Sequence, residues 1–513
     1  MYADGAPAAA HVCSPPRYDV DVAVRSREAG FRGSSDLLLD QAFSRVAGAR
    51  ATAGNRVRLL RDGRENYPAW MDAIAAATTS IHFETYIIHD DRMGLQFAAA
   101  LQKRAAAGVR VRVLYDWWGA RGATGSRFWR ELSAAGVDVR SFNAPRPDSP
   151  FGWISRDHRK CLVVDGRVAF VSGLCVGDAW VGDAVRGVEP WRDTGVAIEG
   201  PAVADVDLAF AGMWSLTGAP FPPAEIANRS GNASSSSAGA QALLRVVATE
   251  PALAGLFKLD HIVVAAAERS LWLTDAYFVA VTSYVQALCE AAHDRVDVRL
   301  LVPGVSDMPG LRALSRAGYR PLLEAGVRVF EWNGPMLHAK TAVADGRWAR
   351  VGSTNLNPAS WLGNWELDVA VEDADFARAM EAMYEDDLQH STEIVIGEQQ
   401  RVRARSLTGV RRRLVRRGSR RAAAGAIGVG STIGAAITNR RPLGPAEARV
   451  LATSGVMLVV CAATILWWPR LAAVPLAIAT VWIALSLIVK AWKIHHNARL
   501  RRNARERSAR ERL

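Results

Sequence analysis

The strongest constraint on the fold is that the chain repeats itself. Matching segments recur in the same order in the two halves: SIHFETYII (80–88) with SLWLTDAYFVA (270–280), VRVRVLYD (109–116) with VDVRLLVPG (296–304), and DTGVAIE (193–199) with ELDVAVE (366–372). The segments have the alternating or continuously apolar patterns typical of strands, and helix-like stretches lie between them. This order predicts an α/β fold built from two homologous repeats.

Shifts in composition set the expected domain boundaries. Residues 217–241 are rich in Pro, Ser, Gly and Asn, which is typical of a linker. We expect an irregular N-terminal arm at 1–50, the first repeat at 51–222, the linker at 223–241, the second repeat at 242–398, an Arg-rich juxtamembrane segment at 399–449, two transmembrane helices at 450–489 and a basic cytoplasmic tail at 490–513.

Charge is distributed unevenly along the chain. Lysine plus arginine number 63 and aspartate plus glutamate 51. Residues 401–513 contain 23 basic and 3 acidic residues, so the body that precedes them is net acidic. Nucleic acid is therefore not expected as a partner, because neutralising its phosphates requires a cationic face. Five cysteines without a Cys-x-x-Cys pair argue against a disulfide scaffold and a Cys-rich zinc site.

Two apolar stretches near the C-terminus have a length that suits a membrane. Val450–Trp468 and Leu471–Val489 each run for 19 residues without a charge. Each would form about 28 Å of helix, against a hydrocarbon core of about 30 Å. They predict a membrane hairpin, with a buried hairpin of a globular domain as the alternative. Arginine-rich segments on both sides place the folded body in the cytoplasm, and Ala422–Thr438 is expected to be an interfacial helix.

Two copies of the pattern HxKxxxxD occupy corresponding places in the two repeats. They are His158, Lys160 and Asp165 in the first repeat and His338, Lys340 and Asp345 in the second. Because only six residues of the chain are lysines, two such matches are not accidental. Each motif predicts a strand, an Asp-Gly turn and a second strand, so its histidine and lysine share one face. We count the two aspartates with the catalytic motifs but interpret them as turn or framework residues.

These residue types suit the cleavage of a phosphodiester. A neutral imidazole can attack phosphorus, and a second imidazole can act as general acid and then as general base. The two lysines can stabilise negative charge on the non-bridging oxygens. Because these four groups come from both repeats, we expect one active site on the pseudo-twofold axis. The chemistry requires no metal or other cofactor, and the sequence contains no convincing cluster of metal ligands.

The paired motifs, with GSTN following the second, resemble the phospholipase D superfamily and, within it, bacterial cardiolipin synthases. The resemblance covers about residues 55–390 and includes WRDTGVAIEGPAV, LLVPGVSD, LHAKTAVADGRWARVGSTNLNPAS and NWELDVAV. It implies two α/β/α sandwich repeats related by a pseudo-twofold axis. It also implies that His158 is the nucleophile and His338 the acid/base, with Asp193 and Glu366 orienting the two histidines.

The resemblance further implies that Ser353 and Asn355 contact the substrate phosphate. The first repeat departs from the family pattern, because Cys175 stands where the family often has asparagine. The implied activity is that of a phosphatidyltransferase that forms cardiolipin from phosphatidylglycerol and a second phospholipid through a phosphatidyl-histidine. Alternatives are a phospholipase D that yields phosphatidic acid, a nuclease of the same superfamily and a non-enzymatic membrane scaffold.

The expected partners are therefore phospholipids. Phosphatidylglycerol and possibly phosphatidylethanolamine are the substrates that we expect, and the Arg-rich segments are expected to attract anionic membrane lipids. The expected location is the bacterial inner membrane, with several spans and the catalytic body on the cytoplasmic side.

Overall fold

The computed structural model describes residues 34–145, 154–183, 185–222, 241–251, 253–308, 310–396 and 402–404, together with scattered residues between 459 and 485. The predicted interfacial helix and basic tail lie outside the described residues, as do nearly all of the linker and the Arg-rich segment and most of the hairpin. Within the described part of the chain, no helix is both long and apolar enough to cross a membrane.

One sheet of sixteen strands runs through the whole body, in the order β16-β15-β11-β10-β9-β12-β13-β14-β8-β1-β7-β6-β5-β2-β3-β4. The strands of the first half are β1 (Thr52–Arg61), β2 (Ser80–Thr85), β3 (Arg110–Asp116), β4 (Asp138–Phe142), β5 (Cys161–Val164), β6 (Val168–Ser172) and β7 (Thr194–Glu199). Those of the second half are β8 (Ala242–Thr249), β9 (Ser270–Thr274), β10 (Asp297–Pro303), β11 (Arg328–Trp332), β12 (Thr341–Ala344), β13 (Trp348–Gly352), β14 (Glu366–Glu372), β15 (Ser391–Ile396) and β16 (Val402–Ala404).

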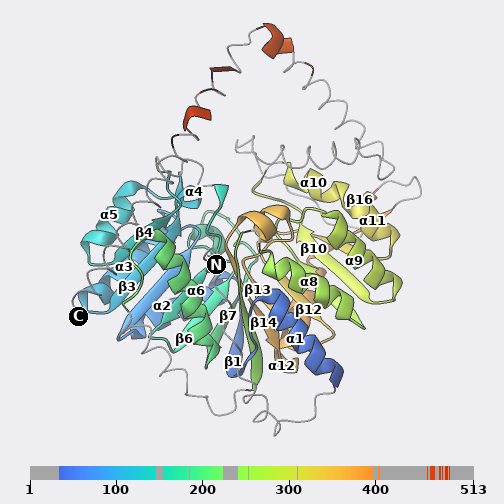
Figure 1. Cartoon of the computed structure of the whole chain (residues 1–513), viewed down its shortest axis with the longest axis horizontal. Helices are drawn as coiled ribbons and strands as arrows, with labels where there is room; N and C mark the ends of the chain where they lie inside the picture. The colour runs from blue at the N-terminus through green and yellow to red at the C-terminus, as the bar shows by residue number, and fades with distance from the viewer. Residues whose placement is uncertain are drawn as a thin grey trace, which may run out of the picture.

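The strand order contains the predicted duplication. β1 and β8 pair antiparallel at the centre. Outward from them the first half reads β7-β6-β5-β2-β3-β4 and the second reads β14-β13-β12-β9-β10-β11, which is the same series of equivalent strands. The three pairs of matching segments form β2 and β9, β3 and β10, and β7 and β14. Figure 1 shows the halves side by side, the first in blue to green and the second in yellow-green to orange.

Helices cover both faces of the sheet and complete an α/β/α arrangement. They are α1 (Ser34–Ala47), α2 (Asp62–Ala76), α3 (Arg92–Ala106), α4 (Trp117–Ala120), α5 (Ser126–Ala134), α6 (Ala202–Thr217), α8 (Gly255–Ala266), α9 (Thr282–His293), α10 (Leu311–Ala317), α11 (Tyr319–Glu324) and α12 (Ala374–Gln389). Short helical turns lie at Asp178–Trp180 and Ala359–Gly363. The side chain of Asp91 caps α3 by accepting from Gly94 N.

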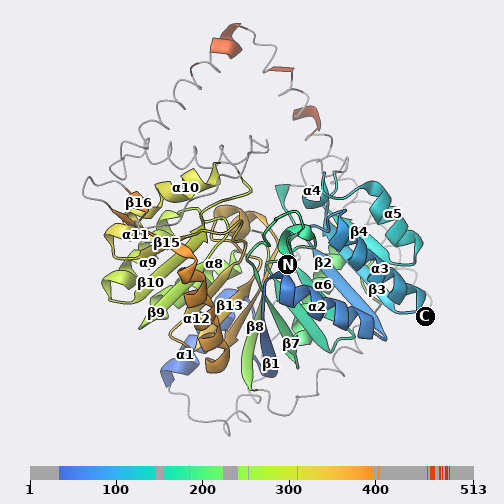
Figure 2. The same cartoon turned by 180° about the vertical axis from the view of Figure 1, so that it is seen from behind.

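The hydrophobic core continues across the boundary between the halves. One cluster joins α6 of the first half to α12 of the second through inward-facing residues of strands from both halves. α6 contacts β8 and α12 contacts β1, so the last long helix of each half packs on the first strand of the other. Separate clusters lie under α2, α3 and α5 and under α1, α8, α9 and α11. The two halves therefore share one sheet and one core, and Figure 2 shows them side by side from behind.

The prediction that residues 1–50 are irregular is wrong for part of that segment. Residues 34–47 form α1, which packs against α8 of the second half. Phe43 and Ala47 are buried in the core cluster under α8, and Asp40 forms an ion pair with the buried Arg245 on β8. Burial of one face against a distant helix stabilises a segment whose local sequence gives a weak signal.

Candidate active site

The two HxK segments enter the sheet directly before equivalent strands. His158 and Lys160 precede β5, and His338 and Lys340 precede β12. Backbone bonds cross between the halves at both places. His158 N donates to Trp365 O over 2.9 Å, and His338 N donates to Arg192 O over 2.7 Å. Each motif is therefore fixed by the backbone of the opposite repeat.

The orienting carboxylates also cross between the halves. His158 Nδ1 lies 2.9 Å from Glu366 Oε2, which belongs to the second half. His338 Nδ1 lies 2.7 Å from Asp193 Oδ2, which belongs to the first half. All four residues are buried. The structure thus brings together the two histidines and the two carboxylates that the sequence selects, and neither repeat alone holds a complete histidine–carboxylate pair.

Each carboxylate is itself held by a further donor. Ser353 Oγ donates to Glu366 Oε2 over 2.6 Å, and Asn364 Nδ2 donates to Glu366 Oε1 over 3.2 Å. In the other pair, the Trp180 indole N–H donates to Asp193 Oδ2 over 3.0 Å. No pattern in the sequence marks Trp180, because it acts through a single indole N–H. Such second contacts fix the orientation of the groups that hold the imidazoles.

Burial favours the neutral form of both histidines. It lowers the pKa of His158 to about 4, although Glu366 acts in the opposite direction. Burial and then Lys340 lower the pKa of His338 to about 3. Because Nδ1 donates to a carboxylate in a neutral imidazole of this kind, Nε2 carries the lone pair. Each histidine is thus prepared as a nucleophile or a base.

The carboxylates remain ionised beside these neutral rings. Burial alone would raise the pKa of Asp193, but His338 and Lys340 hold it below its ordinary value. The pKa of Glu366 is likewise lowered, because His158 and Lys160 outweigh the effect of burial. Each histidine also responds to the lysine of the other motif. The four basic groups therefore lie close enough to influence one another electrostatically.

The lysines lie beneath the histidines of their own motifs. Lys160 Nζ donates to His158 O and Lys340 Nζ donates to His338 O. Burial lowers the pKa of Lys340 to about 8, and Lys160 opposes its charge as well. An anion that enters the site would favour the charged form of Lys340.

A tyrosine stands beside each histidine. The Tyr86 and His158 ring centroids are 5.0 Å apart, and those of Tyr277 and His338 are 5.7 Å apart. Lys160 and Lys340 lie over the same two tyrosine rings, at 5.2 and 5.6 Å. Both tyrosines follow equivalent strands, because Tyr86 comes directly after β2 and Tyr277 comes shortly after β9. They occupy corresponding places in the matching segments SIHFETYII and SLWLTDAYFVA. This recurrence was a signal that could have identified them.

The two motif aspartates directly follow β5 and β12, at the ends of these strands that lie away from the histidines. Asp165 and Asp345 occupy left-handed backbone positions, with φ of 54° each, and glycine follows at φ of 65° and 64°. Two successive residues at positive φ form the hairpin turn that the Asp-Gly pairs predict. Asp165 accepts backbone N–H bonds from residues 78–80, and Asp345 from residues 268–270. This geometry agrees with the framework interpretation.

The predicted phosphate contacts are placed differently. The Ser353 hydroxyl donates to Glu366 and accepts from Leu367 N, so it braces a carboxylate. Asn355 is buried, and its side-chain oxygen has no hydrogen-bond partner among the residues that the structure describes. Direct contact of either residue with phosphate stays a prediction. No group of three or more His, Cys, Asp or Glu residues is arranged to hold a metal ion within the described ranges.

Arg192 is a structural residue that sequence reasoning missed. Its guanidinium forms two bonds of 2.8 Å to Asp387 on α12 and one of 3.1 Å to Asp62. Arg192 is buried and immediately precedes Asp193. Its ion pair with Asp387 therefore fixes Asp193, the carboxylate that holds His338, against the other half. Its sequence context, WRDTGVAIE, was recognised only for the aspartate.

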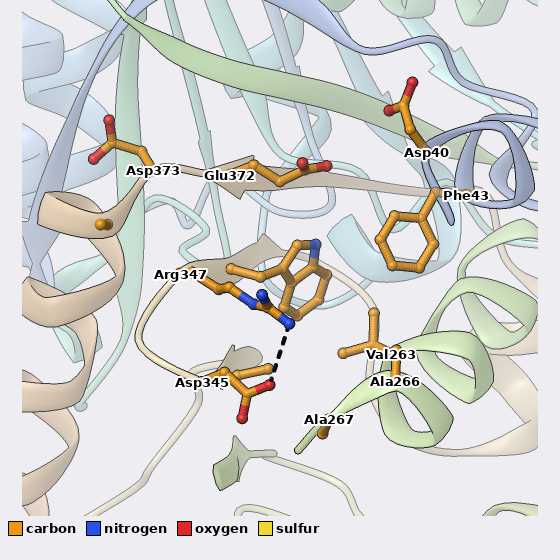
Figure 3. Close-up of a pocket in the computed structure, with 12 residues that line it drawn as sticks. Asp40, Phe43, Val263, Ala266, Ala267, Asp345, Arg347, Glu372 and Asp373 are labelled. Atoms are coloured by element: carbon orange, nitrogen blue, oxygen red, sulfur yellow. Dashed lines mark ion pairs between the residues drawn. The ribbon is translucent and has the colours of Figure 1, made fainter. Parts of the chain in front are cut away.

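A cavity of about 340 Å³ lies away from the histidines, at the turn after β12. Figure 3 shows Asp345, Arg347, Glu372 and Asp40 around it, between α1 and α8. These groups have structural partners: Arg347 lies 3.8 Å from Asp345, and Arg245 pairs with both Asp40 and Glu372. We assign the cavity no catalytic role.

Comparisons with known proteins point to one family. The family model described as "Cardiolipin synthase, PLD-like domain" matches residues 70–178 and 262–388. Cardiolipin synthase A of Pseudomonas fluorescens is 33% identical over 390 residues, which cover 74% of this chain and 78% of that protein. Cardiolipin synthase A of Pseudomonas aeruginosa is 34% identical over 398 residues, covering 76% and 78% of the two chains.

A solved structure shares the fold. The phosphatidylserine synthase of Haemophilus influenzae superimposes with a TM-score of 0.54 at 15% identity, covering 69% of this chain and 92% of that one. The duplicated fold and the paired motifs define the class, which is the phospholipase D superfamily. Within it, the chain belongs to the cardiolipin synthase family. It is an enzyme of the phosphatidyltransferase type.

Proposed function

We propose that this enzyme forms cardiolipin from phosphatidylglycerol and a second phospholipid through a covalent phosphatidyl-histidine. The observation that carries the proposal is the crossed arrangement of His158 with Glu366 and His338 with Asp193. It supplies two oriented imidazoles around one site, one to attack phosphorus and one to carry a proton, as a double displacement at phosphorus requires.

In the first step, His158 Nε2 attacks the phosphorus of the donor lipid. The bond from phosphorus to the headgroup oxygen breaks, and the leaving oxygen takes a proton from His338. The bound phosphodiester supplies the negative charge that raises the pKa of His338 and allows it to hold that proton. Lys160 and Lys340 stabilise the charge that develops on the equatorial oxygens.

In the second step, the hydroxyl group of the acceptor lipid attacks the phosphatidyl-histidine. His338, now neutral, accepts the hydroxyl proton as the new P–O bond forms. The P–N bond breaks, and its electron pair returns to His158 Nε2. Water in place of the lipid hydroxyl would give phosphatidic acid, so exclusion of water from the acceptor site distinguishes the two products.

We further propose that residues 450–489 anchor the enzyme in the bacterial inner membrane, with the catalytic body on the cytoplasmic side. The length of the two uncharged stretches and the arginine-rich flanks support this arrangement. An anchor of this kind would keep the site next to lipid donors and acceptors.

The test uses the full-length protein in vesicles that contain phosphatidylglycerol, with and without phosphatidylethanolamine. Mass spectrometry of the products should show cardiolipin from the wild-type protein and none from His158→Ala. Phosphatidic acid as the sole product would identify a phospholipase D instead. No lipid turnover in any mixture would contradict the proposal, and cleavage of nucleic acid would then be assayed.

A further inference from the structure

The pseudo-twofold symmetry of the active site is broken at the two tyrosines. On the first-half side, Arg156 donates to the Tyr86 hydroxyl oxygen over 3.4 Å. On the second-half side, the Tyr277 hydroxyl donates to the Asp307 carboxylate over 3.0 Å. The tyrosine beside His158 therefore contacts a cation, whereas the tyrosine beside His338 contacts an anion.

Arg156 belongs to a larger group of side chains. Its guanidinium carbon lies 5.5 Å from the centre of the Trp118 ring, and that of Arg121 lies 5.6 Å from the same ring. Trp118 is on α4, which begins directly after β3. We call Trp118, Arg121 and Arg156 the arginine–tryptophan cluster. It places two positive charges around one aromatic ring at the first-half side of the site.

The second repeat is different at the corresponding positions. Met336 stands two residues before His338, where the first repeat has Arg156 before His158. The segment after β10 contains Asp307, whereas the segment after β3 contains Trp118 and Arg121. The difference is one of charge as well as shape, and the duplication of the fold does not require it.

The guanidinium of Arg156 is available to a ligand. The residue is half-buried, and its bond to Tyr86 is long. Within the part of the chain that the structure describes, no carboxylate lies at ion-pair distance from it. Asp116 is near enough to respond to its charge, but Asp116 already accepts from Gly119 N over 2.8 Å and from Asp157 N over 2.9 Å.

The proposed reaction needs a second anion site. Two phospholipids meet in the second step, and each carries one phosphodiester. The one under attack is bound to His158 and faces the two lysines. The second phosphodiester remains anionic on the acceptor, close to the attacking hydroxyl group. Its charge must be compensated by groups other than the two histidines and two lysines.

We propose that the arginine–tryptophan cluster binds the phosphodiester of the acceptor lipid, an inference that rests on the proposed function. Guanidinium groups bind phosphate through paired hydrogen bonds. Asp307 repels an anion from the opposite side, so the charge difference orients the acceptor. Its hydroxyl oxygen then forms the P–O bond as the P–N bond to His158 breaks, and its proton passes to His338.

A competition between two acceptors tests this subsite. Full-length protein in phosphatidylglycerol vesicles is given ethanol, an acceptor without a phosphate, and cardiolipin and phosphatidylethanol are quantified together. Both products use the same donor and the same histidines, so their ratio reports on the acceptor. Arg156→Gln should lower the ratio of cardiolipin to phosphatidylethanol about tenfold, as loss of a charge-assisted contact predicts. Arg156→Lys should restore part of it.

Two further variants complete the experiment. Arg121→Gln removes an exposed guanidinium and should lower the ratio in the same direction, which covers the case that Arg156→Gln does not fold. Arg320→Gln removes an exposed arginine that pairs with Glu324 on α11, and should leave the ratio unchanged. An unchanged ratio in both cluster variants, or a parallel loss of both products, would overturn the subsite alone. A wild-type protein that makes neither product would overturn the proposed function as well.

Discussion

At the scale of single residues, His158 and His338 have matching motifs but different surroundings. Glu366 is braced by Ser353, whereas Asp193 is braced by Trp180, whose ring centroid also lies 5.7 Å from that of His338. A tilted Trp191 ring contacts His338 as well. The two imidazoles are therefore not interchangeable, and this difference is consistent with separate roles.

The role of each histidine predicts the effect of replacing the other. His338→Ala should lower turnover by about 10²–10⁴-fold, the usual contribution of a general acid and base. Because His338 protonates the leaving group and deprotonates the acceptor, both steps should slow, and the phosphatidyl group that still forms should lie on His158. Acid-quenched protein, digested and mapped by mass spectrometry, measures this directly. A phosphatidyl group found on His338 in the wild-type protein would reverse the assignment.

Burial of neutral His158 also predicts a pH dependence of stability. Its pKa falls from 6.5 to about 4 on folding, so the unfolded chain binds one more proton between these values. The free energy of unfolding should therefore decrease as the pH falls from about 6.5 to about 4, with no contribution from this group above that window. His158→Gln should make the decrease less steep in urea titrations. Equal slopes in variant and wild type would contradict the assignment of His158 as the source.

The sequence predicted the site residues better than their pairing. His158, Lys160, His338 and Lys340 follow from a repeated pattern of scarce residue types. The crossing of Glu366 to His158 could not be predicted, because Glu366 lies 28 residues from His338 in the same repeat and strand geometry alone does not relate one repeat to the other. Trp180 acts through a single indole N–H, which leaves no pattern in the sequence.

At the scale of elements, the aspartate of each motif hairpin both forms the turn and accepts hydrogen bonds from a neighbouring segment of backbone. The β5–β6 and β12–β13 hairpins each turn on Asp-Gly, and the same aspartate holds the backbone that leads into β2 or β9. These hairpins were predictable because turn chemistry is local. α1 was not, since its stability depends on burial against α8.

The hydrogen bonds that Asp345 accepts predict that this residue contributes to the stability of the fold and not to catalysis. Asp345→Ala leaves three backbone N–H groups without their acceptor, and should lower the free energy of unfolding by about 1–3 kcal/mol. Turnover per folded molecule should stay within a few-fold of the wild type. Chemical denaturation and an activity assay on the same preparation separate the two effects. A loss of turnover as large as that of His338→Ala, at unchanged stability, would make Asp345 a catalytic group.

At the scale of the whole molecule, an acidic body is joined to a strongly basic C-terminal region. The shared core under α6 and α12 and the ion pairs of Arg192 hold the two repeats in one register. Such rigidity suits a site whose parts come from both repeats. It does not bring the site to a lipid surface, and in our proposal residues 399–513 perform that task.

Two mechanisms of membrane attachment predict different responses to extraction. Attraction of arginines to anionic lipid contributes about 1 kcal/mol per residue and extends over about one Debye length. Because that length shortens as the salt concentration rises, salt weakens the attraction. A pair of apolar helices inserted in the bilayer is insensitive to salt. We expect the full-length protein to remain in the membrane pellet in 1 M NaCl and in alkaline carbonate, and a chain ending at residue 398 to be released. Release of the full-length protein by salt alone would show that residues 450–489 do not span the bilayer.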